Sequence, residues 1–413
     1  MTREILTLQI GNQSNYVGVH FWNQLEHEFN QKNSSIDFHS YLTFNQKTNL
    51  PTARVLICDY RNTFGHLLDE NPMKFEANPS IEIINRLKSD NSWSKYLKTR
   101  TKFNEKSLLP LRDYWHNDEN QNNQFDIYPI GQEVFKTNID QFEHSIHFLL
   151  ESCDSLQSFR CLYDVNNSFS GLFSSIQDYL HDECPKQPIW SFAIGENSSS
   201  SIYNLAFSLV NSINENHMPT LACLDNPDAF ETSLAIQHAL YSSLFPLDVL
   251  ADRLCPMKRS FLKLFSKIPF DYAPSKTLMN YLDKTDLFPS LNPSAMHFVV
   301  RGLTKAQLYN SSVSKFDFET AGELIERYLR EEYNSHMFIS NTSWTEKYDG
   351  INVLSAMIND EKSSEEFFGQ LIEKLKKSNL KTISKRWQEN NFDEQMFEQL
   401  INDLSVLHEQ YLF

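Results

Sequence analysis

Two loops in the first half of the chain join an apolar stretch to a helical pattern. The first lies in TLQIGNQSNYVG, where an alternating apolar stretch at residues 4–11 passes through Gly11 into a helical pattern at 15–30. The second is VNNSFSG at 165–171, which follows an apolar stretch at 159–165 and precedes another helical pattern. A strand that turns directly into a helix points backbone N–H groups and the helix dipole at an anion. The chemistry that the first loop suggests is the binding of a nucleotide's phosphates.

Polar residues at the ends of other apolar stretches have the right types to complete such a site. Asp59 lies near the end of VLICDY and suits either a water-mediated contact with Mg²⁺ or hydrogen bonds to loop amides. Asn226 ends TLACLDN and suits the cap of a helix that begins at Pro227; contact with a guanine edge is the alternative that the family resemblance given below implies. Gly11 and Gly18 either approach a nucleotide or only permit a tight turn. We favour the structural role in each case.

Glycine is too scarce for a complete phosphate loop. Only 10 of the 413 residues are glycine, roughly a third of the usual fraction of ~7%. Backbone that wraps closely around phosphates needs glycine at several adjacent positions. In 165–171 the only glycine is Gly171. The net charge of −16 also gives no general attraction for a triphosphate or for nucleic acid.

Other reactive side chains form weaker patterns. His144, His147 and Glu151 share one helical face and are either an incomplete metal site or, as we favour, a solvated face. The six cysteines include no CxxC pair, which favours free buried thiols over disulfides or zinc. The basic run at 373–386 is either a solvated helix end or a docking patch for an anionic partner. No serine-hydrolase or zinc-protease motif is present.

The elements that must position the two loops alternate along the first 244 residues. Apolar strand-like stretches alternate with amphipathic helical patterns, which predicts an α/β fold with a doubly wound, mostly parallel sheet covered by helices on both faces. Ligands bind such sheets at the carboxyl ends of the strands. Those ends fall at Gly11 and Asn12, Asp59, Val165 and Asn166, Gly195, and Asn226.

Two polar regions interrupt this alternation, and the second half of the chain differs in style. Residues 31–51 and 86–126 have weak periodicity and are expected to be loops. After about residue 270, strand patterns at 295–303 and 350–359 and a helical pattern at 363–377 predict a smaller α+β domain. The chain then closes with helices.

Hydrophobic spacing predicts which helix faces are buried. In the helix at 15–30, Val17, Phe21, Trp22 and Leu25 share one face, and Trp22 is expected in the core. Ser363 is expected to cap the helix at 363–377. The last helix has an apolar stripe that needs cover, made of Met396, Phe397, Leu400, Ile401, Leu404 and Leu407.

The order of these elements and several short motifs resemble tubulin, and more closely the Misato-type tubulin-like proteins. The opening REILTLQIGNQSNYVGVHFW is similar to the first strand of tubulin, its GQCGNQIG loop and the helix that follows; the matching residues are Gly11, Asn15, Gly18, Phe21 and Trp22. RVLICDY resembles RAILVDL, CDSLQSF resembles CDCLQGF, and LDNPDAF resembles IDNEALY. FVVRGL, INVLSAMIND and RWQENNFDEQMFEQLINDL match the second half of tubulin in order and type.

The resemblance implies a tubulin-like fold with a degenerate GTPase frame. It divides the chain into a nucleotide-binding-type domain at 1–245, a central helix with an intermediate α+β domain at 246–385, and a C-terminal helical segment at 386–413. The tubulin signature GGGTGSG falls on VNNSFSG, and the second tubulin glycine loop, GAGNNW, has no counterpart. The residual nucleotide-site positions that it implies are Gly11, Asn12, Asn15, Asp59, Ser170, Gly171 and Asn226. It implies no catalytic residue and no metal ligand, and GTP is the only cofactor to consider.

The function implied by the resemblance is non-enzymatic. Misato-type proteins are associated with mitochondrial distribution and the inheritance of mitochondrial DNA, without an established enzyme activity. One alternative is a GTP-binding, self-assembling cytoskeletal GTPase. This alternative is supported by Gly11, Asn15 and Asn226. Another is an assembly factor for tubulin or its chaperonin, which would use the shared fold to bind its partner. In each of these hypotheses the expected ligands are proteins, with tubulin and its chaperonin as candidates. None of them requires nucleic acid.

The expected location is the cytoplasm and the outer face of mitochondria. The first residues include neither an apolar leader nor an arginine-rich presequence. No stretch approaches the 18 apolar residues of a membrane span. We therefore expect synthesis in the cytosol and contact with mitochondria from outside.

Overall fold

The structure is a computed structural model of the 413-residue chain. Side chains are described for most residues of the N-terminal region and of the C-terminal helices, whereas only the backbone is described for strands from residue 217 to 359. The described residues are 4–30, 37–44, 50–68, 92–116, 124–195, 202–212, 217–223, 262–267, 295–301, 335–340, 353–359, 361–378, 385–390 and 392–409.

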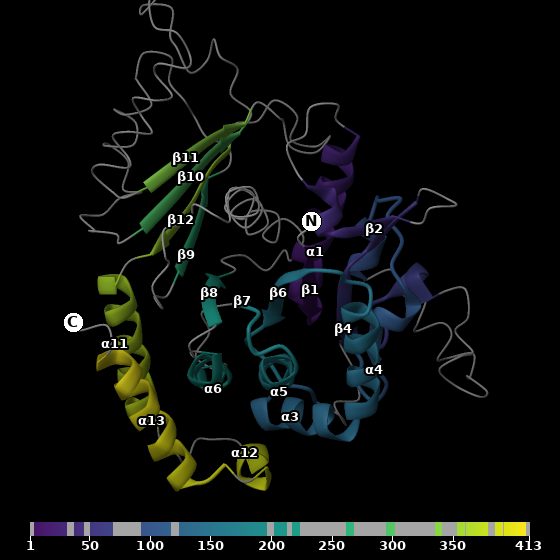
Figure 1. The fold of residues 1–413 in the computed structure, drawn as a ribbon. Coiled ribbons are helices and arrows are strands. Elements are labelled where there is room, and N and C mark those ends of the chain that lie inside the picture. The colour runs from purple at the N-terminus through teal and green to yellow at the C-terminus, as the bar shows by residue number, and fades with distance from the viewer. Residues whose placement is uncertain are drawn as a thin grey trace, which may run out of the picture.

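A ten-stranded sheet runs through the described part of the molecule (Figure 1). Its order is β11-β10-β12-β9-β8-β7-β6-β1-β4-β5. The strands are β1 (Glu4–Ile10), β4 (Val55–Tyr60), β5 (Leu108–Leu111), β6 (Leu156–Asp164), β7 (Ile189–Gly195), β8 (His217–Cys223), β9 (Leu262–Lys267), β10 (Ala295–Arg301), β11 (Ser335–Ser340) and β12 (Val353–Asn359). All neighbours from β5 to β9 are parallel, whereas β12 is antiparallel to both β9 and β10. The predicted α/β architecture with a mostly parallel first part is confirmed.

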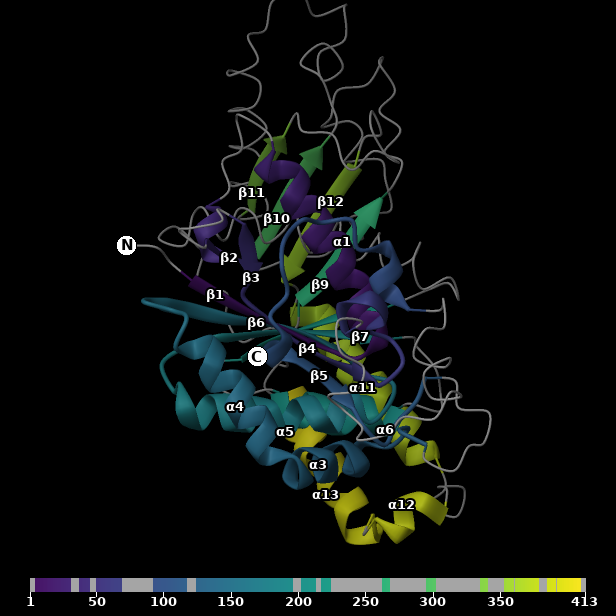
Figure 2. The ribbon, with the colours of Figure 1, turned by 90° about the vertical axis from the view of Figure 1, so that its right-hand side faces the viewer.

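Helices cover the parallel strands on both faces. Figure 2 shows α1 on one face and α3, α4, α5 and α6 on the other. The helices are α1 (Asn12–Phe29), α3 (Tyr128–Thr137), α4 (Ile139–Leu150), α5 (Phe169–Glu183), α6 (Ile202–Ser212), α11 (Glu361–Lys377), α12 (Lys385–Glu389) and α13 (Glu394–Glu409). Short 3-10 helices are η1 (Phe38–Ser40), η2 (Gly65–Leu68), η4 (Trp93–Tyr96) and η5 (Glu105–Ser107).

Alternate residues of the central strands supply two separate cores. Because successive side chains of a strand point to opposite faces, Val55 and Ile57 of β4 pack with α1, and Leu56 and Cys58 pack with α3, α4 and α5. Trp22 is 1% exposed in the first core, as the sequence predicts. Burying such a side chain contributes about 1.5–3 kcal/mol.

The C-terminal helices pack against the outer side of α6 (Figure 1). Tyr203 of α6 contacts the rings of Trp387, Phe392 and Phe397, and its hydroxyl lies 2.6 Å from the Ser378 hydroxyl. Arg386 of α12 forms an ion pair of 2.8 Å with Asp126, just before α3. The C-terminal helices are thereby joined to the N-terminal region.

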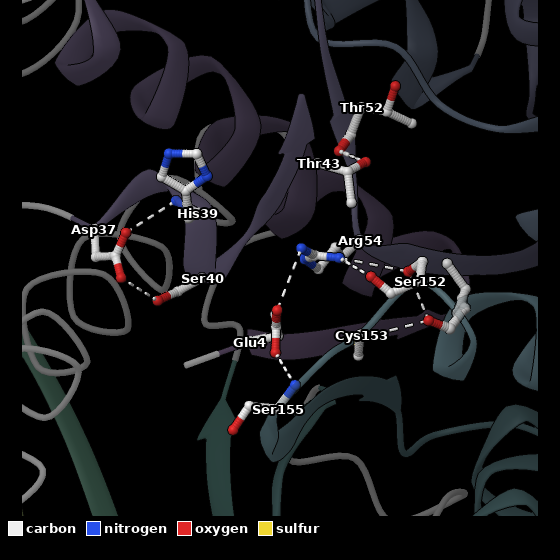
Figure 3. A network of polar contacts seen from close by, with 11 residues as sticks. Glu4, Asp37, His39, Ser40, Thr43, Thr52, Arg54, Ser152, Cys153 and Ser155 are labelled. Carbon is white, nitrogen blue, oxygen red and sulfur yellow. Dashed lines mark hydrogen bonds and ion pairs between the residues drawn. The ribbon is translucent and has the colours of Figure 1, made fainter. Parts of the chain in front are cut away.

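A buried charged group joins the beginnings of β1 and β4 to the end of α4 (Figure 3). The Arg54 guanidinium lies 3.8 Å from Glu4 and donates a hydrogen bond of 2.6 Å to the Ser152 carbonyl. Glu4 in turn accepts a 2.6 Å hydrogen bond from the Ser155 amide. These contacts satisfy buried charges that would otherwise destabilise the start of the sheet.

Four expectations need correction. Residues 31–51 include η1 and part of a two-stranded sheet, in which β2 (Leu42–Phe44) pairs with β3 (Pro51–Ala53). Residues 86–126 contribute η4, η5 and the edge strand β5. These elements are too short to give a detectable hydrophobic periodicity, and they form through tertiary contacts. The helix α11 begins at Glu361, so Ser363 lies inside it and does not cap it.

The fourth correction concerns the last helix. Phe397, Leu400, Leu404 and Leu407 are buried in α13, whereas Met396 is 41% exposed. Met396 therefore lies beside the buried stripe and is not part of it. Among the helices that the structure describes, none combines the length and the apolar character needed to cross a lipid bilayer.

Candidate functional site

Three neighbouring strands end side by side at the first phosphate-type loop. In the sheet register, Ile10 of β1 is paired with Cys58 of β4 and with Tyr163 of β6. The residue that follows each of these is Gly11 after Ile10, Asp59 after Cys58 and Asp164 after Tyr163. We call these three residues the strand-end row. It places a carboxyl group on each side of the turn that opens α1.

Asp164 binds the beginning of α1. Its carboxyl oxygens accept hydrogen bonds from the backbone amides of Gln13, at 3.0 Å, and Ser14, at 2.8 Å. The Ser14 hydroxyl donates a third bond of 2.7 Å. These amides belong to the first turn of the helix, where backbone N–H groups have no partner within the helix. Asp164 thus occupies the position that an anionic ligand takes at a phosphate-binding helix.

Asp59 is held from the other side of the row, mainly by side chains. Its carboxyl group accepts hydrogen bonds from the side-chain amides of Asn12, at 3.3 Å, and Asn15, at 2.9 Å. The indole of Trp93 donates another bond of 2.8 Å, and the Tyr60 amide donates one of 2.7 Å. Asp59 therefore links the start of α1 to η4.

Both carboxyl groups are fully enclosed, and this changes their acidity. Burial raises the pKa of Asp59 to about 6, against the opposing effect of the hydrogen bonds from Asn15 and Tyr60. Burial raises the pKa of Asp164 to about 7, and the charge of Asp59 adds to that effect while Ser14 opposes it. The strand-end row is therefore a pair of weakened acids beside a helix start.

The side chains of the second loop, residues 165–171, bind or pack against other parts of the protein. The Ser168 hydroxyl donates to the Ile127 carbonyl at 2.6 Å, and the Ser170 hydroxyl donates to the Asn167 carbonyl at 2.6 Å. Phe169 is fully buried, with its ring 5.1 Å from that of Tyr60. These side chains leave the loop hydroxyls committed to the protein backbone.

Gly171 serves helix packing. A Cβ at Gly171 would lie 1.9 Å from the Tyr128 carbonyl oxygen, and one at Gly131 would lie 1.8 Å from the Ser168 carbonyl oxygen. The two glycines allow α3 and α5 to approach closely. Gly18 has a similar role in α1, where the Gln9 side chain fills the space that a Cβ would need.

Asn204 of α6 connects the second loop to α3. Its side-chain oxygen accepts a hydrogen bond from the Tyr128 amide at 2.8 Å. Its nitrogen donates to the carbonyls of Asp126, at 2.8 Å, and Asn166, at 2.9 Å. All of its polar atoms are used to hold the loop and α3 together.

The structure brings together only part of the site that the sequence suggests. Gly11, Asn12, Asn15 and Asp59 meet at the strand-end row, whereas Ser170 and Gly171 face α3 and the loop backbone. Asn226 and Cys255 lie outside the described residues. For Cys223 only the backbone is described.

Three site residues escape a reading of the sequence: Asp164, Trp93 and Asn204. Asp164 has a detectable signal, because LYDV ends a strand with aspartate as VLICDY does. Trp93 lies in a region without periodicity, and nothing in the sequence joins it to Asp59. Asn204 looks like an ordinary polar residue of an amphipathic helix.

GTP, the ligand that a tubulin-like frame implies, does not fit the described residues. The first-turn amides that would bind a phosphate are bonded to Asp164, and a second carboxyl group lies across the turn. In the second loop, the hydroxyls of Ser168 and Ser170 bind carbonyl groups. A triphosphate would meet carboxyl groups in place of free donors.

Other reactive groups lie apart from the row. His144 and His147 of α4 and Glu151, which follows it, are exposed, and the His147 ring lies 2.9 Å from the Tyr179 hydroxyl. Within the described residues, no three His, Cys, Asp or Glu side chains gather closely enough to hold a metal ion. Cys58 and Cys161 are buried free thiols, and Cys153 and Cys184 are free but half-buried.

Two family descriptions of tubulin-like domains match overlapping parts of the chain. The family description of the Misato segment II tubulin-like domain matches residues 3–110, and that of the tubulin domain matches residues 85–236. Together the two matches cover both loops and all three members of the strand-end row.

Relatives of the chain carry matching names. It is 25% identical to Protein DML1 of Phaeosphaeria nodorum over 48% of this chain and 46% of that protein. It is 24% identical to Protein dml1 of Aspergillus clavatus over 59% of this chain and 60% of that protein. It is also 24% identical to Protein misato homolog 1 of Mus musculus over 50% of this chain and 48% of that protein. The chain thus spans roughly half of the length of the relatives that it matches.

Proposed function

Because the chain is a Misato-type tubulin-like protein, we propose that it acts as a non-enzymatic protein in the distribution of mitochondria, their partitioning and the inheritance of mitochondrial DNA. Its ligands in this proposal are proteins, with tubulin or its chaperonin as candidates, met in the cytoplasm or on the outer face of mitochondria. The proposal extends to the whole protein what the family resemblance suggests for its matched part.

One observation carries the non-enzymatic part of the proposal. The donors that a GTPase of this fold would turn toward phosphate are bonded to the chain itself, through Asp164 at α1 and through carbonyl groups at the second loop. Removing these internal partners without replacing them would leave buried polar groups unpaired, which is costly. In this proposal the frame binds other proteins in place of a nucleotide.

Cell fractionation and rescue test the proposal. In cells depleted of the protein we expect mitochondria to be unevenly distributed, and a tagged copy to restore them. Part of the tagged protein should co-sediment with mitochondria and be digested by protease added from outside. Protein found only in the nucleus, or protected within the mitochondrial matrix, would contradict the proposal.

A matched variant separates this function from that of a GTPase. Asn226→Ser keeps a residue type that caps helices but removes the amide that could read a guanine edge. We expect Asn226→Ser to rescue mitochondrial distribution as well as the unchanged chain. Failure of the variant at normal protein levels would favour the GTPase.

A further inference from the structure

We propose that the Asp164 carboxyl group supplies, at the beginning of α1, the acceptor oxygens that a ligand supplies at a phosphate-binding turn, so that the nucleotide-type frame folds without nucleotide. This inference rests on the proposed function in treating the frame as nucleotide-free. It assigns to Asp164 a role that neither its sequence context nor the family comparison gives it.

The hydrogen bonds of Asp164 are those of a ligand. Both carboxyl oxygens are used: one accepts from the Gln13 amide, and the other accepts from the amide and the hydroxyl of Ser14. The N-terminus of an α-helix carries unpaired N–H groups and a positive partial charge, and it attracts anions for both reasons. Here the attracted group comes from the end of β6, 150 residues further along the chain.

The turn is shaped around this carboxyl group. Gly11 has a φ of 115°, a value that side chains other than hydrogen rarely allow. A Cβ at Gly11 would lie 2.4 Å from the Asp164 Cγ, so the glycine also provides the room that the carboxyl group occupies. In a phosphate-binding turn the same glycine would open the backbone toward a ligand. In this chain it opens the backbone toward Asp164.

Asp59, the other aspartate of the strand-end row, does not bind the backbone amides of α1 as Asp164 does. It is as deeply buried as Asp164, but most of its donors are side chains, among them Asn12, Asn15 and Trp93. Loss of Asp59 would leave mainly side-chain donors without their acceptor. Loss of Asp164 would leave two backbone amides of the first helical turn without theirs.

Chemical rescue distinguishes the two aspartates. We compare Asp164→Ala with Asp59→Ala as the matched control, in the full chain, with formate and inorganic phosphate as probes and potassium chloride at equal ionic strength. We expect both variants to melt several degrees below the unchanged chain. Formate and phosphate should raise the melting temperature of Asp164→Ala in a saturable way and leave Asp59→Ala and the unchanged chain near their chloride values.

Hydrogen exchange reports on the site directly. The Gln13 and Ser14 amides should be protected in the unchanged chain, exchange faster in Asp164→Ala, and regain protection when formate is added. If Asp164→Ala does not fold, Asp164→Asn offers the same shape with one acceptor oxygen, and one of the two amides should then exchange faster.

Several outcomes would overturn the inference. Equal melting temperatures and equal amide protection with and without Asp164 would show that the carboxyl group is not needed there. Destabilisation that neither formate nor phosphate relieves would show that Asp164 matters only for packing. These results are independent of the proposed function, since mislocalised protein would leave rescue by formate unaffected, and failed rescue would leave the location of the protein unaffected.

Discussion

Gly11 is the residue on which the turn between β1 and α1 depends. Its φ of 115° and the Asp164 carboxyl group beside it both exclude a side chain. Gly369 offers a contrast, because a Cβ there would make only an ordinary contact of 3.5 Å with His408. The two glycines should therefore respond to alanine in opposite directions.

We expect Gly11→Ala to lower the free energy of unfolding by more than the ~1–2 kcal/mol cost of a left-handed residue, because Asp164 must also move. Gly369→Ala, inside α11, should raise it by about 0.5–1 kcal/mol through helix propensity. Urea unfolding followed by circular dichroism measures both. A Gly11→Ala protein as stable as the unchanged chain would show that the turn is not constrained as described.

Asp59 and Asp164 should make stability fall as the pH rises. Burial raises their pKa values in the folded chain to about 6 and about 7, from 3.8 when the chain is unfolded. Between about pH 4 and pH 7 the folded chain then binds more protons than the unfolded chain, so the free energy of unfolding decreases with pH. The stability gained by protonation is complete below pH 3.8 and is lost as the pH passes the raised values.

Asp164→Asn removes one of these two titrations. We expect the variant's free energy of unfolding to depend less steeply on pH between about 5 and 7 than that of the unchanged chain, by an amount of order 1.4 kcal/mol for each pKa unit removed. Urea titrations at intervals of pH provide the measurement. Equal slopes for the two proteins would mean that Asp164 titrates in its ordinary range.

At the scale of elements, α13 shows how a helix attaches the C-terminal segment to the body. Leu400 is 2% exposed and belongs to the core shared with α6 and α11, whereas Met396, one turn earlier, is 41% exposed. Position 396 lies in the first turn of α13, where a negative charge is favourable. The same substitution should therefore have different effects at these two sites.

We expect Leu400→Asp to cost several kcal/mol, because it buries an unpaired charge. Met396→Asp should change the free energy of unfolding by no more than about 0.5 kcal/mol. Thermal melts of the two variants give the comparison. If Leu400→Asp melts like Met396→Asp, the packing of α13 on α6 is not maintained in solution.

At the scale of the whole molecule, one sheet connects the parallel N-terminal region to the mixed strands of the second half. The junction is the parallel pair β8 and β9, where Thr220 and Leu221 are paired with Leu262 and Lys263. The C-terminal helices then return to the N-terminal region through Arg386 and Asp126. Segments distant in the sequence are thereby joined through the sheet and through this ion pair.

Affinity for GTP is a property of this whole arrangement. The chain has a net charge of −16, and the first-turn amides and loop hydroxyls are already bonded. Each lost charge-assisted hydrogen bond is worth roughly 1.5–3 kcal/mol, so three lost bonds weaken binding by at least about three powers of ten. We expect calorimetry to give a Kd in the high-micromolar range or weaker, and no hydrolysis above background. A sub-micromolar Kd that Asn226→Ala abolishes would support the GTPase instead.

Hydrophobic patterning along the chain was sufficient to predict the α/β class, the order of most strands and helices, and the burial of Trp22, because these depend on side chains close together in sequence. Motif order was sufficient to identify the tubulin-like family. Patterning did not predict β2, β3 or β5, which are short strands formed through tertiary pairing. It also assigned Met396 to the buried stripe of α13, although the orientation of the helix leaves Met396 exposed.

The identity of the group at the start of α1 depended on register. Only when β4, β1 and β6 align does Asp164, distant in sequence, lie against Gly11 and bind the amides of Gln13 and Ser14. Contacts of that kind are decided by how the strands pair, and no local pattern specifies them.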